Sequence, residues 1–126
     1  MKKLFFIGSL IWFGLNAFSQ VVPVGVVNAI GDGDAGKFAG YFHNNVEIRI
    51  LGEDHVASKN QATRIMHEFF KNNPPVSFSI NYEGNKNDSK YGFGTLVTKK
   101  GTYRINLYFM KGRKNPVIYS ISIEKT

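Results

Sequence analysis

Residues 58–75, SKNQATRIMHEFFKNNPP, decide how the rest of the sequence is interpreted. Ser58 and Gln61 have the spacing of a capping box, in which the serine hydroxyl accepts from the third helical amide and the glutamine reaches back to the cap. Apolar residues then recur on one helical face, namely Ala62, Ile65, Met66, Phe69 and Phe70. Pro74 and Pro75 end the helix, because proline lacks an amide hydrogen and keeps the preceding residue extended. The stretch therefore predicts one long amphipathic helix.

Downstream of Pro75 the sequence alternates with a period of two, as half-buried strands do. Polar turns at 85–88, 99–101 and 112–116 separate four such stretches. We expect an antiparallel meander of four strands with one apolar face. The expected inward rows are Val76, Phe78, Ile80 and Tyr82; Tyr91, Phe93, Thr95 and Val97; Tyr103, Ile105, Leu107 and Phe109; and Val117, Tyr119, Ile121 and Ile123.

Three shorter elements precede the long helix. Pro23 favours a first helix over 24–30, and Asp34 is placed to cap a second that runs through Phe42. Residues 46–50 alternate strictly and predict one earlier strand. A sheet that is apolar on one side must be covered, and the helices are the available cover. The predicted class is α+β: a curved antiparallel sheet, a four-strand meander plus one earlier strand, wrapped around a long helix, with two short N-terminal helices.

The first residues have the three parts of a secretory signal peptide. Lysines follow Met1, an uncharged apolar run covers 4–15, and small residues precede a cleavage point between Ser19 and Gln20. A membrane-spanning helix would need about 20 apolar residues. We predict that residues 1–19 are a signal peptide. The exported product would be a soluble single domain, residues 20–126, in the periplasm or outside the cell, without a membrane span.

The balance of charge is positive, with 16 Lys plus Arg against 9 Asp plus Glu, and the chain has no cysteine. The lack of cysteine excludes a disulfide framework and a cysteine metal site. Basic clusters at 99–100 and 111–114 flank one predicted strand, which puts them roughly 30 Å apart. No nucleic-acid surface is expected, because the clusters are separated and no aromatic residues interleave with them. Weak attraction to anionic polysaccharide or lipid headgroups stays open as an alternative.

Two motifs suggest cofactor or metal chemistry and are rejected. Residues 31–36, GDGDAG, match a dinucleotide-binding fingerprint, but two aspartates would repel phosphate and hairpins follow in place of βαβ units. His43, His55 and His67 lack the spacing that places metal ligands on one helical face. No serine has a partner histidine and acid at a recognisable spacing. We therefore predict no cofactor and no metal site.

Several segments resemble the nuclear transport factor 2-like superfamily, and within it a group of small exported bacterial proteins of unknown function. The segments that carry the resemblance are 29–32, 37–42, 46–48, 58–62, 69–75 and 93–96. The resemblance implies a cone-shaped α+β half-barrel, a fold shared by ketosteroid isomerases, dehydratases and non-catalytic binding modules. In the enzymes Asp, His or Tyr project into the cone. The expected inward rows here hold no Asp, Glu or His, so no catalytic residue is assigned.

The sequence leaves three functions open, of which we expect a non-catalytic binding or interaction module. A small apolar ligand in the cone would contact Phe42, Ile48, Tyr82, Tyr103 and Tyr119, unless these residues only pack the core. An isomerase, dehydratase or hydrolase would pair a tyrosine donor with Glu47 or Glu53. An interaction module would form a homodimer through the polar outer face of the sheet, which carries Ser77, Ser79, Asn81, Thr102, Arg104, Asn106, Tyr108, Ser120 and Ser122.

Overall fold

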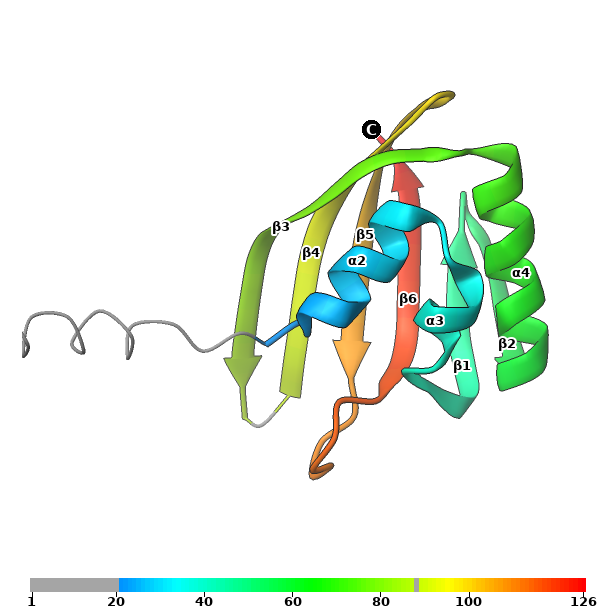
Figure 1. The fold of residues 1–126 in the computed structure, drawn as a ribbon. Coiled ribbons are helices and arrows are strands. Elements are labelled where there is room, and N and C mark those ends of the chain that lie inside the picture. The colour runs from blue at the N-terminus through cyan, green and yellow to red at the C-terminus, as the bar shows by residue number, and fades with distance from the viewer. Residues whose placement is uncertain (1–20, 88) are drawn as a thin grey trace, which may run out of the picture.

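The computed structural model describes residues 21–87 and 89–126. The predicted signal peptide, residues 1–19, lies outside the described residues. The predicted α+β class is confirmed, with helices and one curved sheet (Figure 1). In chain order the elements are α2 (Val24–Asp32), α3 (Ala35–Ala39), β1 (Phe42–Ile50), β2 (Glu53–Ser58), α4 (Lys59–Asn72), β3 (Pro75–Lys86), β4 (Ser89–Thr98), β5 (Gly101–Phe109) and β6 (Ile118–Lys125).

The sheet has six strands in the order β2-β1-β6-β5-β4-β3. The predicted meander β3 to β6 is present, but β6 pairs with β1 in parallel, so the sheet is not wholly antiparallel as expected. Side-chain alternation predicts that a segment is a strand but does not indicate which strand pairs with it. The β1–β6 pair also joins segments that are far apart in the chain. The strand β2 was missed because Ala57 is its one buried residue, which leaves no alternation to detect.

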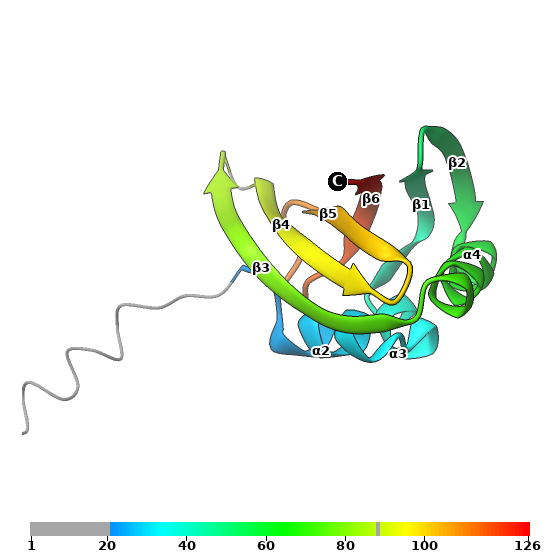
Figure 2. The same ribbon diagram turned by 90° about the horizontal axis from the view of Figure 1, so that it is seen from above.

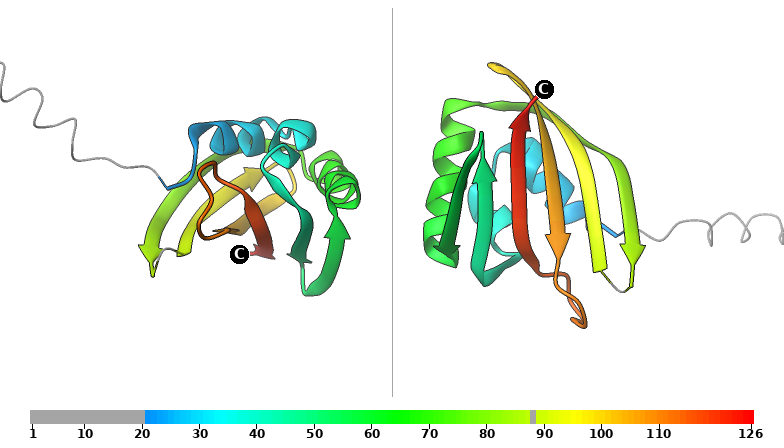
Figure 3. Two further views of the ribbon diagram at one scale, coloured as in Figure 1. Left: turned by 90° about the horizontal axis from the view of Figure 1, so that it is seen from below. Right: turned by 180° about the vertical axis from the view of Figure 1, so that it is seen from behind.

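The three helices of the described residues lie against one face of the sheet, and none of them lies on the other face (Figures 2 and 3). The helix α2 packs on β3, whereas α4 contacts α3, β1 and β2. Between helices and sheet lies one apolar core, whose fully buried members include Ile30, Phe38, Met66, Leu96, Ile105 and Ile121. We call the uncovered side the open face. Within the described residues, no helix has both the length and the apolar content to cross a bilayer.

The helix ends follow the predicted capping chemistry. At the start of α4, Gln61 N donates to Ser58 Oγ and Ser58 N to Gln61 Oε1, both at 3.1 Å. The glycine-rich segment 31–36 spans the end of α2 and the start of α3, where Gly33 ends α2 with a φ of 68° and Asp34 caps α3. The second helix is shorter than predicted, because Phe42 already belongs to β1.

The capping box makes a direct prediction for stability. Replacing Ser58 by alanine removes the acceptor for Gln61 N, so we expect the free energy of unfolding to fall by about 1 kcal/mol. Urea titration followed by circular dichroism measures this change. Ser77→Ala, at an exposed position of β3, is the matched control and should change stability by less than about 0.5 kcal/mol. Equal losses in both variants would contradict the role of the cap.

Candidate functional site

Three of the five predicted ligand contacts, Phe42, Ile48 and Tyr103, are buried in the core. The Phe42 ring meets Phe38 edge to face, with 4.8 Å between ring centroids. Tyr103 packs edge to face on Phe69 at 5.2 Å, and its hydroxyl donates to Asn73 Oδ1 at 2.7 Å. The side chains of these residues therefore already have protein neighbours, which gives them a clear packing role. Their role as ligand contacts stays a prediction.

The prediction that Tyr82 faces the interior is wrong, because β3 contains a β-bulge. Ile80 pairs with Gly94 and Tyr82 with Phe93, so Asn81 is an extra residue that shifts the alternation by one. Tyr82 consequently lies on the open face and is 56% exposed. The same shift reverses the direction of the next residue, Glu83. Its Oε1 accepts hydrogen bonds from the Val21 and Val22 amides at 3.1 and 2.8 Å.

A second irregularity places Tyr119 on the surface. Along β5 and β6, Tyr108 pairs with Ser120 and Phe109 with Ile118, which leaves Tyr119 as the unpaired residue. Its side chain is 38% exposed. The inward row of this strand is Ile118, Ile121 and Ile123. The expectation that Tyr119 points inward is therefore wrong for the same physical reason as at Tyr82, since a bulge resets the period of two.

The strand β4 is turned over relative to the expectation. Gly92, Gly94, Leu96 and Thr98 are its buried residues, so the predicted inward row starting at Tyr91 faces outward. A Cβ atom at Gly94 would lie 2.6 Å from the Phe78 ring, and one at Gly92 would collide with Val22. The close packing of the inner layer leaves room only for glycine there. Alternating glycines within a strand are the sequence signal for such a close approach.

This orientation assembles an aromatic cluster on the open face, consisting of Tyr82, Tyr91, Phe93 and Tyr108. Ring centroids lie 5.4 Å apart for Tyr91 and Phe93, 6.0 Å for Tyr82 with either of these, and 6.2 Å for Phe93 and Tyr108. A hydrogen bond with Tyr82 and desolvation raise the pKa of the Tyr91 phenol. Four rings from β3, β4 and β5 thus form a partly exposed apolar surface, which sequence reasoning had placed largely inside.

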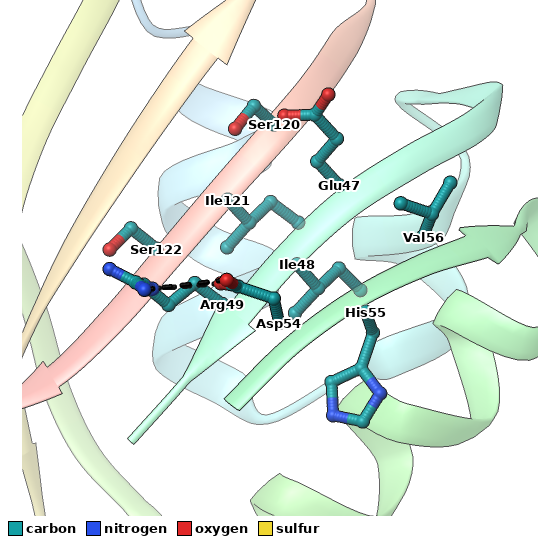
Figure 4. Close-up of a pocket in the computed structure, with 9 residues that line it drawn as sticks. All are labelled: Glu47, Ile48, Arg49, Asp54, His55, Val56, Ser120, Ile121 and Ser122. Atoms are coloured by element: carbon teal, nitrogen blue, oxygen red, sulfur yellow. Dashed lines mark hydrogen bonds and ion pairs between the residues drawn. The ribbon is translucent and has the colours of Figure 1, made fainter. Parts of the chain in front are cut away.

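The other half of the open face is polar and contains a hollow of about 400 Å³ over β1, β2 and β6 (Figure 4). Arg49 and Asp54, paired across β1 and β2, form a two-point ion pair with Nε–Oδ1 2.8 Å and Nη2–Oδ2 3.3 Å. The hydrogen bond and charge of Asp54 raise the pKa of the Arg49 guanidinium. Glu47, Ser120 and Ser122 complete the polar lining.

Acidic, histidine and serine side chains line this hollow, but the histidine and the serines are not directed toward one another. The His55 side chain points away from Ser120 and Ser122 (Figure 4), and its Nε2 lies 3.9 Å from a Glu53 carboxylate. Glu47 and Glu53 are exposed, whereas the Tyr103 hydroxyl is in the core and bonded to Asn73. Across residues 21–87 and 89–126, no three His, Asp or Glu side chains are grouped as metal ligands. The arrangement is suited to recognition by polar contacts and stacking.

A family model, described as a domain of unknown function (DUF4783), matches residues 24–124. The chain belongs to the DUF4783 family. The matched range begins at Val24, the first residue of α2, and ends at Glu124, one residue before the end of β6. The DUF4783 domain therefore covers the helices and strands described above. No curated protein matches the chain.

Solved structures agree with this assignment. A DUF4783 protein from Bacteroides ovatus is 30% identical, with a TM-score of 0.81 over 86% of this chain and 98% of that one. A DUF4783 protein from Bacteroides uniformis is 33% identical, with a TM-score of 0.78 over 83% and 97%. A cystatin-like domain of unknown function from Nostoc punctiforme has a TM-score of 0.65 at 9% identity, over 82% and 72%. The predicted nuclear transport factor 2-like, cystatin-like fold is confirmed.

Proposed function

We propose that this DUF4783 protein is a non-catalytic interaction module that works through the open face of its sheet, and that its partner there is a second copy of the chain. The observation that carries the proposal is the aromatic cluster of Tyr82, Tyr91, Phe93 and Tyr108, which no helix covers. Exposed aromatic groups of this size are typical of binding surfaces, because ring burial supplies most of the stabilisation in an interface.

The charges of the open face favour a copy of itself as the partner. Arg49 and Arg104 lie on this face together with Glu47 and Glu124, and Arg104 stands opposite Glu124 across β5 and β6. A two-fold interface brings the same patch of two copies together, so a patch of one sign would repel itself. A face that carries both signs can instead pair acid with base across the symmetry axis.

The centre of the open face offers a further group for a partner. Asn106 pairs with Phe93 on one side and Ser122 on the other, between the aromatic and polar halves. Its Oδ1 is buried, and no described residue donates a hydrogen bond to it. Unsatisfied buried oxygens are uncommon and costly in folded proteins. A donor delivered by a partner, with a small rotation of the amide, would satisfy this oxygen.

The interior supports the two other functions less well. The residues expected to hold a ligand in the cone either pack the core, as Phe42 and Tyr103 do, or lie on the surface, as Tyr82 does. An enzyme that pairs a tyrosine with Glu47 or Glu53 would need the acid beside the phenol. Both carboxylates are exposed, and the buried Tyr103 hydroxyl is bonded to an amide.

Native mass spectrometry and sedimentation of the protein purified from its own cells test the proposal. We expect a dimer that dissociates on dilution. Phe93→Asp should weaken it by at least about 30-fold, since a charge would replace a central ring and a hot-spot residue contributes 2 kcal/mol or more. Tyr82→Ser, at a more exposed ring, should weaken it by a smaller factor.

The matched control is Asn28→Asp, which adds the same charge at an exposed position of α2, on the opposite side of the sheet. This variant should dimerise as the unmodified chain does, and circular dichroism should show all variants folded. A monomer at every concentration, or a Phe93→Asp variant that dimerises normally, would overturn the proposal. The intact mass in the same spectra also tests our proposal that the protein acts after export, since it should begin at Gln20.

A further inference from the structure

A second hollow, of about 600 Å³, lies away from the aromatic cluster and the ion pair of the open face. It is lined by the β5–β6 loop, which extends beyond the sheet in Figure 1, by the start of β4 and by the segment that leads into α2. Three cations line it, Lys90, Arg113 and Lys114, and among residues 21–87 and 89–126 no aspartate or glutamate does. The β5–β6 loop was singled out in the sequence only as part of a dispersed positive charge.

None of these three cations forms an ion pair with a described residue, and the nearby Glu83 carboxylate is bound to the Val21 and Val22 amides. The ion pairs among the described residues join Arg49 to Asp54 and His55 to Glu53, at the β1–β2 edge of the sheet. Cations that line one hollow raise the local concentration of anions. Arginine in particular presents a planar fork that matches a phosphate or carboxylate at two points.

The remaining lining is apolar, which distinguishes this hollow from a solvated basic loop. Phe109 is buried, and Met110 and Pro23 are partly buried. The wall on the N-terminal side is held in place, because Glu83 accepts the Val21 and Val22 amides. The helix α2 starts directly after Pro23 with no acidic residue in its first turn, so its positive end adds to the same field.

We propose that this hollow is a binding site for a single-chain anionic amphiphile, with its phosphate or carboxylate head on Lys90, Arg113 and Lys114 and the start of its alkyl chain on Met110, Phe109 and Pro23. Free amphiphiles and membrane lipids share this head-group chemistry. The apolar part of the lining favours the free monomer, because a bilayer would keep the alkyl chain of its lipid.

Isothermal titration of the purified protein tests this site with dodecyl phosphate below its micelle concentration. We expect one saturable site. Inorganic phosphate should bind far more weakly, since each buried methylene is worth about fourfold in affinity. Arg113→Glu should lower the affinity by about tenfold or more, as expected for loss of a charge-assisted hydrogen bond. Lys114→Glu should act in the same direction.

Lys111→Glu is the matched control, because it makes the same charge change in the same loop at a residue that does not line the hollow. Its effect should be less than about threefold, since it removes only long-range attraction. Equal losses in Lys111→Glu and Arg113→Glu would overturn the site, as would inorganic phosphate that binds as tightly as dodecyl phosphate. Binding to phosphatidylglycerol vesicles without binding of the monomer would also overturn it and would assign the loop to a membrane surface.

Discussion

Replacing Phe38 by alanine is expected to lower the free energy of unfolding by about 3–5 kcal/mol, the usual cost of emptying a buried phenylalanine site. Phe38 is 0% exposed, and its ring lies 4.8 Å from Phe42 and 6.4 Å from Phe70. It therefore joins α3 to both β1 and α4, and its neighbours cannot collapse into the space without moving two elements. Calorimetry should show a fall of more than about 12 °C in Tm for a domain of this size.

Two companion variants separate the cavity from a general effect of mutation. Phe38→Leu keeps most of the volume and should cost less than half as much. Val56→Ala changes a side chain that is 80% exposed and should alter stability by less than about 0.5 kcal/mol. A loss of less than about 1 kcal/mol in Phe38→Ala would mean that the helices do not pack on the sheet as described.

Gly94→Val should destabilise the protein, although valine is the better strand residue. The backbone at Gly94 is ordinary extended strand, so propensity alone predicts a gain of up to about 1 kcal/mol. A Cβ there would instead lie 2.6 Å from both the Phe78 ring and the Ser79 carbonyl oxygen. The ring is buried between layers and cannot swing away, so we expect a loss of about 1–3 kcal/mol or more. Chemical denaturation gives the sign directly.

Gly36→Ala is the matched control for this substitution. A Cβ at Gly36 would have Asp34 Oδ1 as its nearest neighbour at 3.6 Å, an ordinary contact, and the residue lies in α3. Alanine should therefore stabilise the helix by about 0.5–1 kcal/mol. If Gly94→Val raised stability, the placement of Tyr91 and Phe93 on the open face would be wrong, because valine would then fit on the inner face.

The parts of the fold predicted correctly from the sequence depend on short-range chemistry. The helix α4 begins directly after its cap Ser58 and stops before Pro74, because capping groups and proline act on backbone amides within four residues. The Asp34 cap of α3 follows the same rule. The α+β class followed from two periods, 3.6 in α4 and 2 in β3 to β6, which any local window reveals.

The candidate site was predicted poorly because it depends on which way each strand faces. Tyr82 and Tyr119 were assigned inward from unbroken alternation, whereas one extra residue in β3 and another in β6 reverse the assignment. At β4 the row that starts at Tyr91 was assigned inward, whereas the buried row holds Gly92, Gly94 and Leu96. The glycine row faces inward because Phe78 and Val22 pack closely against it. Both residues are distant from it in sequence.

The sequence by itself therefore determined the α+β class, the limits of α4 and the positive charge of the β5–β6 loop, because each depends on neighbouring residues. The tertiary structure alone decided that β1 lies parallel to β6, that four aromatic rings meet on the open face, and that Lys90 joins Arg113 and Lys114 around one hollow. These features arise where segments far apart in the chain compete for the same space. Their arrangement depends on steric fit between side chains that are distant in sequence, and a local sequence pattern does not predict that fit.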